Sequence, residues 1–184
     1  GSINFDMVYQ VPEFPAPGQT LAADEVSRGL GGKGANMSVA AARAAARVKH
    51  IGAIGADGAW ARDLMMEFGV DISHIATLPS ATGHAIILLN SEGENSIVLY
   101  PGANRNIAED GVAAALSAAH TGDTLLLQNE TNGQEAAAKM ARQLGLRVVY
   151  AAAPFDEEAV RAVLPHIDFL ILNEGEAADL VSEM

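Results

Sequence analysis

The 184 residues are 49% hydrophobic and only 18% charged, a composition typical of a folded globular protein. The formal net charge of −12 disfavours nucleic-acid binding, because phosphate contacts require clustered Lys and Arg. The absence of cysteine excludes disulfides, thiol nucleophiles and cysteine-ligated zinc. Since no apolar run approaches the roughly 18 residues that span a bilayer, and no signal peptide is visible, we expect a cytoplasmic protein without a membrane partner.

Polar residues stand near the start of the chain, where Asn4 and Asp6 flank Phe5. By themselves these residues fit either a ligand site or a simple turn. A Pro-rich turn follows over residues 12–18, and the segment from Thr20 to Arg28 resembles an exposed strand.

The stretch Gly-Gly-Lys-Gly-Ala-Asn at residues 31–36 is the most informative part of the sequence. Glycines without a Cβ let the backbone approach a ligand closely, and the alanine-rich segment from Val39 to Val48 predicts a helix directly afterwards. A glycine turn that opens a helix leaves backbone N–H groups free for an anion or a polyhydroxylated ligand. Because Lys33 and Asn36 add a charge and an amide, we expect a binding loop. A turn that only caps the helix is the structural alternative.

Two known phosphate-binding motifs can be compared with this loop. Residues 29–34 satisfy the G-x-G-x-x-G dinucleotide pattern, but the segment in front of them is too polar for the buried strand that this motif requires. A Walker P-loop is excluded, because Lys33 is followed by Gly34 where Ser or Thr should hold magnesium. A dinucleotide-binding oxidoreductase fragment stays an alternative.

The middle of the chain predicts one α/β unit and one hairpin. The α/β unit consists of a strand from His50 to Ile54 and a helix from Ala59 to Phe68. Ala85 to Asn90 and Ser96 to Tyr100 are apolar strands joined by a short polar turn, which predicts a β-hairpin. With the exposed strand near Thr20, the hairpin would form an antiparallel lid (segments about 12–30 and 84–101) that closes over a site and expels water.

In the last third of the chain, short apolar strands alternate with helices. The expected strands are residues 124–128, 147–151 and 168–172, and the expected helices are residues 134–144, 156–164 and a last one from residue 174. Such apolar strands separated by helices indicate a parallel sheet covered on both faces. The predicted fold class is therefore α/β, a doubly wound and mostly parallel sheet with a small antiparallel β lid, in one domain over residues 1–184.

Asn173, Glu174 and Glu176 follow the last predicted strand, at the edge where open α/β sheets bind ligands. An amide and carboxylates at this edge suit a substrate or a metal. The first turn of a helix would favour the same acidic residues for purely structural reasons.

Six motifs follow one another through the whole chain. They are Gly-Ser-Ile-Asn-Phe-Asp at 1–6, Phe-Pro-Ala-Pro-Gly at 14–18, Gly-Gly-Lys-Gly-Ala-Asn at 31–36, Glu-Gly-Glu-Asn at 92–95, Pro-Gly-Ala-Asn at 101–104 and Asn-Glu-Gly-Glu at 173–176. In this order and spacing they resemble the ribokinase-like, or PfkB, family of sugar kinases. The resemblance implies a ribokinase-like fold and, for the complete protein, transfer of the ATP γ-phosphoryl group to a sugar hydroxymethyl oxygen with Mg²⁺.

The resemblance also implies a role for each matching residue. Asn4 and Asp6 would hydrogen-bond sugar hydroxyls from the end of the first strand. Glu130, after the strand at 124–128, would be a further sugar contact. The glycine loop would grip the other side of the sugar through a set of four residues: Gly32, Lys33, Gly34 and Asn36.

Two more implied roles concern ATP and assembly. Asn173 and Glu176 match an Asn-x-x-Glu element that organises magnesium and the ATP phosphates, so Glu176 would reach the metal through water. The lid would also form the interface of a homodimer.

Parts of the family pattern are absent. The catalytic base, an Asp in a Gly-Ala-Gly-Asp motif, would lie beyond Met184, together with the adenine-binding segments and a monovalent-cation loop. The chain also begins at the tip of the family's first strand. We therefore expect no kinase turnover from these 184 residues alone. The alternatives are a non-catalytic sugar-binding or interaction module and a nucleoside kinase of the same family, and the sequence does not identify the sugar.

Overall fold

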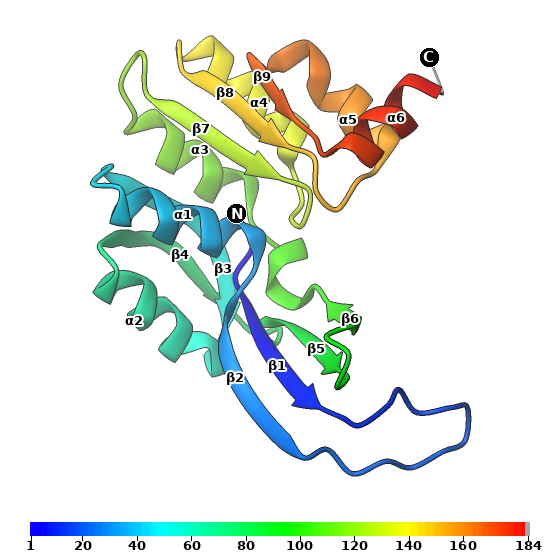
Figure 1. Cartoon of the computed structure of the whole chain (residues 1–184). Helices are drawn as coiled ribbons and strands as arrows, with labels where there is room; N and C mark the ends of the chain where they lie inside the picture. The colour runs from blue at the N-terminus through cyan, green and yellow to red at the C-terminus, as the bar shows by residue number, and fades with distance from the viewer. Residues whose placement is uncertain (183–184) are drawn as a thin grey trace.

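The computed structural model describes residues 1–182 (Figure 1). In this range the strands are β1 (Asn4–Gln10), β2 (Glu25–Gly31), β3 (Val48–Gly55), β4 (Val70–Leu78), β5 (Gly83–Leu89), β6 (Asn95–Tyr100), β7 (Thr124–Gln128), β8 (Arg147–Ala151) and β9 (Phe169–Ile171). The α-helices are α1 (Lys33–Arg43), α2 (Ala59–Glu67), α3 (Glu109–Ser117), α4 (Gln134–Gln143), α5 (Glu157–Val163) and α6 (Glu174–Ser182). None of these helices is long and apolar enough to cross a membrane.

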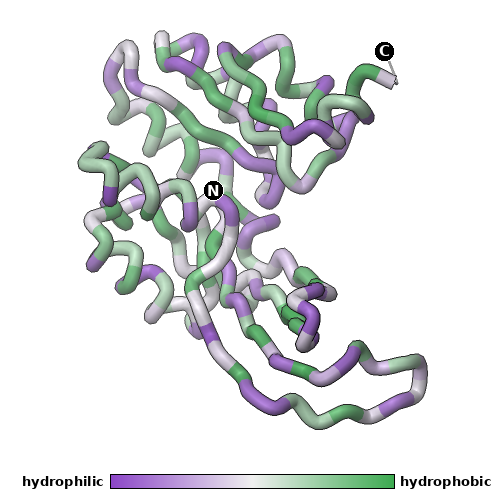
Figure 2. Tube along the Cα trace, viewed as in Figure 1, coloured by the Kyte–Doolittle hydropathy of each residue, from purple (hydrophilic) through white to green (hydrophobic). Residues whose placement is uncertain are grey.

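The parallel strands confirm the predicted α/β fold class. Strand β3 pairs with β4, and β7, β8 and β9 pair in that order, all in parallel. Each of these pairs is joined by a helix, as a parallel crossover requires: α2, α4 and α5 respectively. In Figure 2 the middle of β7 is hydrophobic, whereas β1 alternates between hydrophobic and hydrophilic residues. The apolar run of β7 is typical of parallel strands, although Leu126 in its middle is 36% exposed in this structure, and the alternation in β1 is typical of a sheet with two unlike faces.

A second kind of sheet stands apart from the parallel strands. Its order is β2-β1-β5-β6, and in Figure 1 its outer strand ends, with the loop between β1 and β2, extend away from the body. We call this four-stranded sheet the lid sheet. The predicted hairpin is confirmed, since β5 and β6 pair antiparallel from His84–Tyr100 to Leu89–Asn95. The sheet is not purely antiparallel, however, because β1 pairs in parallel with β5.

The helix after the glycine loop differs from the sequence prediction. Helix α1 begins at Lys33 and ends at Arg43, so the predicted range of Val39 to Val48 was wrong at both ends. Its end is set by Ala45, which has a φ of 65°, a left-handed conformation that no helix continues through. Val48 then belongs to β3, because pairing with β4 outweighs the helix propensity of the alanine run.

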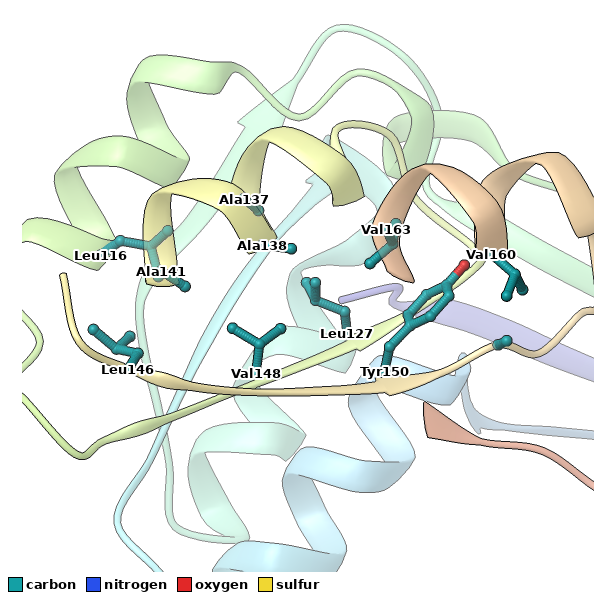
Figure 3. Packing of buried hydrophobic residues seen from close by; sticks show 11 residues of the cluster. Leu116, Leu127, Ala137, Ala138, Ala141, Leu146, Val148, Tyr150, Val160 and Val163 are labelled. Atoms are coloured by element: carbon teal, nitrogen blue, oxygen red, sulfur yellow. The ribbon is translucent and has the colours of Figure 1, made fainter. Parts of the chain in front are cut away.

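The buried side chains form two clusters. One lies between β7, β8 and the helices α4 and α5, and includes Val148, Tyr150 and Val160, each fully buried (Figure 3). The other includes Ile3, Ile54 and Met65, and it packs α1 and α2 against the first strands. Each cluster thus supports one parallel sheet.

A cavity of about 1050 Å³ separates the two parallel sheets. It is lined by residues of β3 and β7 and by the helices α1, α3 and α4. Gly1 lies at its border, where the terminal amine donates a hydrogen bond of 2.5 Å to the carbonyl oxygen of Ile51. Within residues 1–182, no hydrogen-bonded strand joins β3 to β7.

Candidate functional site

Strand β1 carries the first pair of candidate residues. The sequence prediction placed Asn4 and Asp6 at the end of a strand, but they stand at its beginning, because residues 4–10 pair with β2 and β5 along their whole length. Side chains alternate along a strand, so Asn4 and Asp6 share one face of the lid sheet and Phe5 lies on the other. Asn4 is buried and Asp6 is half-buried.

A buried asparagine holds the start of this strand. The side-chain amide of Asn104 donates to Asn4 Oδ1 at 2.7 Å and to the carbonyl oxygen of Ile3 at 3.1 Å. Its Oδ1 accepts from the backbone N–H of Ile3 at 2.9 Å. In the sequence, Asn104 stands out only as part of the motif at 101–104, because a contact across about a hundred residues leaves no local signal.

The glycine loop lies against the same face. Gly31 pairs with Asn4, and a Cβ on Gly31 would stand 2.0 Å from Asp6 Oδ1, so only glycine leaves space for that carboxylate. Gly32 has a φ of 89°, a conformation that glycine adopts without strain, and it turns the chain from β2 into α1. The strand before the loop is exposed and antiparallel to β1, which agrees with the argument against a dinucleotide fold.

Glu130 joins this loop to the other half of the molecule. Its Oε2 accepts from the backbone N–H of Lys33 at 2.9 Å and from the hydroxyl of Ser2 at 2.5 Å. The Lys33 ammonium stands 3.9 Å from Glu130 Oε1. Ser2 Oγ in turn accepts from the backbone N–H of Gly34 at 3.1 Å. In the sequence Ser2 stands out only as part of a motif, whereas these hydrogen bonds show that it links Glu130 to the first turn of α1.

The charges of this group influence one another. Burial raises the pKa of Asp6, the nearby Glu130 carboxylate raises it further, and Lys33 acts in the opposite direction. The side chain of Glu130 is only 9% exposed, whereas that of Lys33 is 40% exposed. The site therefore offers carboxylate acceptors beside a partly exposed ammonium donor, which is the mixture of donors and acceptors that a polyol needs.

The remaining candidate residues lie outside this network. Asn36 is exposed on the first turn of α1, and its backbone N–H bonds to Gly32. The large cavity between the sheets shares Gly34 with the site but is not lined by Asn4, Asp6, Lys33 or Glu130. That these four residues line one pocket covered by the lid sheet stays a prediction.

Asn173 and Glu176 form a structure of their own at the start of α6. The backbone N–H of Asn173 donates to Glu176 Oε2, and the backbone N–H of Glu176 donates to Asn173 Oδ1, both at 2.8 Å. This reciprocal pair is a capping box, which stabilises the helix start by itself. Across residues 1–182, neither side chain bonds to the group around Glu130.

The described residues offer a limited set of metal ligands. No group of three or more His, Cys, Asp or Glu side chains in residues 1–182 is placed to hold a metal ion. Magnesium bound to a nucleotide needs only one or two protein carboxylates, because phosphates and water complete its shell. Glu176 fits that requirement, since only its Oε2 is occupied by the capping box.

Fold and site together define an α/β protein in which an accessory β sheet, a glycine loop and the Glu130 carboxylate meet. The sequence matches the profile of the pfkB family carbohydrate kinases over residues 1–184, and the chain belongs to this family.

The relatives identify the branch of the family that this chain resembles. It is 41% identical over 182 residues to a ribokinase of Haemophilus influenzae, covering 96% of this chain and 59% of the relative. A ribokinase of Cryptococcus neoformans solved with ADP superimposes with a TM-score of 0.86 at 34% identity, over 99% of this chain and 57% of that one. A ribokinase of Arabidopsis thaliana solved with ribose and ATP gives a TM-score of 0.82 at 26% identity, over 99% and 61%. The chain thus spans about three-fifths of the length of the ribokinases it matches.

Proposed function

We propose that the complete protein transfers the γ-phosphoryl group of ATP to a hydroxymethyl oxygen of a free sugar, and that this chain supplies the sugar-binding part. The observation that carries the proposal is the convergence of Asp6, Lys33 and Glu130, which come from β1, the glycine loop and the end of β7. Ribokinases similar to this chain, one of them solved with ribose and ATP, support the choice of a sugar and of ATP.

The proposed binding mode follows from the donors and acceptors of the site. Asp6 accepts from sugar hydroxyls, and the Lys33 ammonium donates to them. Glu130 has one oxygen committed to the loop, so its main task is to hold Lys33 and Ser2 in place. Once a bound ligand covers them, such groups reject ligands without matching hydroxyls, because a polar group left buried and unpaired is costly.

The nucleotide side of the proposal concerns Asn173 and Glu176. Their capping box occupies the backbone N–H groups of Asn173 and Glu176, so a phosphate at the N-terminus of α6 would be met by the N–H groups of Glu174 and Gly175. Glu176 would act on Mg²⁺ through a bound water. When bound, magnesium would neutralise charge on the phosphates, on which phosphoryl transfer mainly depends. A monovalent cation and the proton-accepting base are assigned to sequence beyond residue 184.

We further propose that the lid sheet joins two copies of the chain in a homodimer. The proposed location is the cytoplasm, because the reaction consumes ATP.

The direct test is sugar binding by the 184-residue chain, measured by calorimetry with ribose, deoxyribose, fructose and adenosine. We expect one free sugar to bind and Glu130→Gln to weaken that binding at least tenfold, because Glu130 loses the charge that holds Lys33. Glu135→Gln is the matched control: Glu135 is an exposed acidic residue in the first turn of α4, and this variant should bind the sugar as the parent chain does.

Turnover is measured with the same preparation as sugar-dependent ADP release. We expect none above background from this chain. Binding of adenosine but of no free sugar would replace the proposal with a nucleoside kinase, and binding of none of the four would contradict it.

A further inference from the structure

Three side chains stack on the face of the lid sheet opposite to Asn4 and Asp6. The Arg28 guanidinium carbon stands 4.4 Å from the centre of the Phe5 ring and 4.1 Å from that of Trp60. The two rings are themselves 5.1 Å apart, with an angle of 31° between their planes. Arg28 belongs to β2, Phe5 to β1 and Trp60 to α2, so the stack joins the lid sheet to the body of the molecule.

The stack is the interaction that holds the Arg28 side chain. Arg28 forms no ion pair with any residue in the described range 1–182, although the sequence carries 23 acidic residues against 11 basic ones. Guanidinium groups within about 6 Å of an aromatic ring centre are attracted by the ring electrons, and two rings act on this one. The register of β1 and β2 places Arg28 opposite Met7, on the Phe5 face, so the contact follows from the strand pairing.

Phe5 transmits this contact to the candidate site. It stands between Asn4 and Asp6 in the sequence and is 8% exposed, so the packing of its ring restrains the stretch of backbone that carries both neighbours. Trp60 resists a shift of this ring because it is anchored in α2, and its indole nitrogen is buried without a hydrogen-bond partner. Stacking, and not hydrogen bonding, therefore fixes the position of this indole.

We propose that Arg28 is a positioning residue for the sugar site: by stacking on Phe5 and Trp60 it fixes the lid sheet against α2 and so holds Asn4 and Asp6 where they meet the ligand. The inference rests on the proposed function, since it assigns those two residues to the sugar. It assigns Arg28 no contact with the substrate.

Two substitutions of Arg28 test this role. Arg28→Met keeps an unbranched side chain and removes the charge, and Arg28→Lys keeps the charge but loses the planar group that stacks. Arg43→Met is the matched control, because Arg43 stands 5.6 Å from the Phe68 ring at the far end of α1 and its loss changes the net charge equally. Thermal unfolding establishes that each variant is folded before it is compared.

The first readouts need no ligand. Trp60 is the only tryptophan of the chain, so its fluorescence reports on the stack alone. In Arg28→Met we expect a red-shifted emission, stronger quenching by acrylamide and altered amide NMR shifts of Asn4 and Asp6. Arg28→Lys should show smaller changes of the same kind, and Arg43→Met should match the parent.

The second readout is affinity for the sugar found by calorimetry. We expect Arg28→Met to weaken binding by about fivefold, the loss that corresponds to one partly exposed cation–π contact. Unchanged amide shifts of Asn4 and Asp6 together with unchanged affinity would overturn the inference and leave the stack as packing only. If the parent chain binds no sugar, the proposed function fails, and the inference is then decided by the amide shifts: their change upholds the positioning of Asn4 and Asp6, and their constancy refutes it.

Discussion

The amide of Asn104 satisfies three polar atoms at the start of β1, and nothing else in residues 1–182 replaces it. With 1% of its surface exposed, it is one of the most buried polar residues. We predict that Asn104→Ala destabilises the chain by about 3 kcal/mol, because buried Asn4 and Ile3 groups lose their partners. Urea unfolding measures this loss. Asn106 is exposed and makes one long side-chain hydrogen bond, of 3.3 Å, to the carbonyl oxygen of Gly102, so Asn106→Ala should cost less than about 1 kcal/mol. Equal losses of stability in the two variants would contradict the role of Asn104.

His50 makes the stability of the fold depend on pH. Its ring lies between Ser38 Oγ at 2.8 Å and the carbonyl oxygen of Gly1 at 2.9 Å. Burial, with a smaller contribution from the Gly1 amine, lowers the pKa of His50 to about 3, although the hydrogen bond to Gly1 opposes this shift. Between about pH 3 and 6.5 the unfolded chain therefore binds a proton at His50 that the folded chain does not. Stability must fall as the pH drops through this window.

The predicted size of this pH effect follows from the linkage relation. From pH 7 to 4.5 the free energy of unfolding should fall by about 2–3 kcal/mol through His50 alone, at about 1.4 kcal/mol for each pH unit below 6.5. Because glutamine does not titrate, the His50→Gln variant should lack this fall in the free energy of unfolding when urea unfolding is measured at the two pH values. His120→Gln alters a side chain that is 91% exposed and should retain it. A parent and a His50→Gln variant with the same pH dependence would show that the ring is protonated in the fold.

At the scale of elements, substitutions at two helical glycines compare the effect of helix propensity on stability with the effect of close packing. Gly34 lies in the first turn of α1, where a Cβ would stand 2.4 Å from the backbone nitrogen of Ser2. Gly111 lies in α3 with no atom within 4 Å of an added Cβ. We predict that Gly111→Ala stabilises the chain by about 0.5–1 kcal/mol, as alanine generally does in a helix. Gly34→Ala should destabilise it by about 1–3 kcal/mol, because α1 must move away from Ser2.

Thermal and urea unfolding of these two variants provide the comparison, and sugar affinity adds a second measure. Gly34→Ala should also weaken binding, since the shift of α1 carries Lys33 with it, whereas Gly111→Ala should bind as the parent does. Stabilisation by both substitutions would mean that the first turn of α1 adapts freely and does not define the site.

The strands of the last third could be predicted from the sequence, and the reason is local. Short apolar runs such as Leu125–Leu127, bounded by polar residues, produce the same signal whatever surrounds them. The end of α1 could not be predicted, because an alanine run contains no stop signal and the strand that replaces it depends on pairing with β4. Strand β4 itself was missed, since its mixture of polar and apolar residues shows no clear period.

The candidate site shows the same limit more strongly. Asp6, Lys33 and Glu130 are separated by up to 124 positions; from the residues alone Asp6 and Lys33 each had a structural explanation, and nothing marked Glu130. Only the family resemblance suggested that they meet, because convergence of distant segments is a property of the whole fold. Asn104 and the Arg28 stack were missed for that reason, as both depend on contacts between elements.

At the scale of the whole molecule, β6 is the open edge of the lid sheet. All its residues are exposed, including Ile97 at 54% and Val98 at 67%. An exposed edge strand offers unpaired backbone groups, and a patch of apolar side chains on it marks an interaction surface. The register with β5 places Ile97 on the same face as Asp6, so a partner bound there would also cover the candidate site.

We predict that the chain dimerises through this edge, and that Ile97→Lys shifts it toward the monomer by at least tenfold in dissociation constant, because the substitution buries a charge in an apolar contact. Sedimentation velocity over a range of concentrations measures the shift. Val181→Lys is the matched control: Val181 is 70% exposed on α6, outside the lid sheet, and its substitution should leave the association unchanged. If Ile97→Lys and Val181→Lys sediment alike, or if the parent is a monomer at every concentration, the apolar residues of β6 do not join two copies. If association and sugar affinity both weaken in Ile97→Lys alone, the partner copy helps to close the site, since Ile97 and Asp6 share one face of the lid sheet.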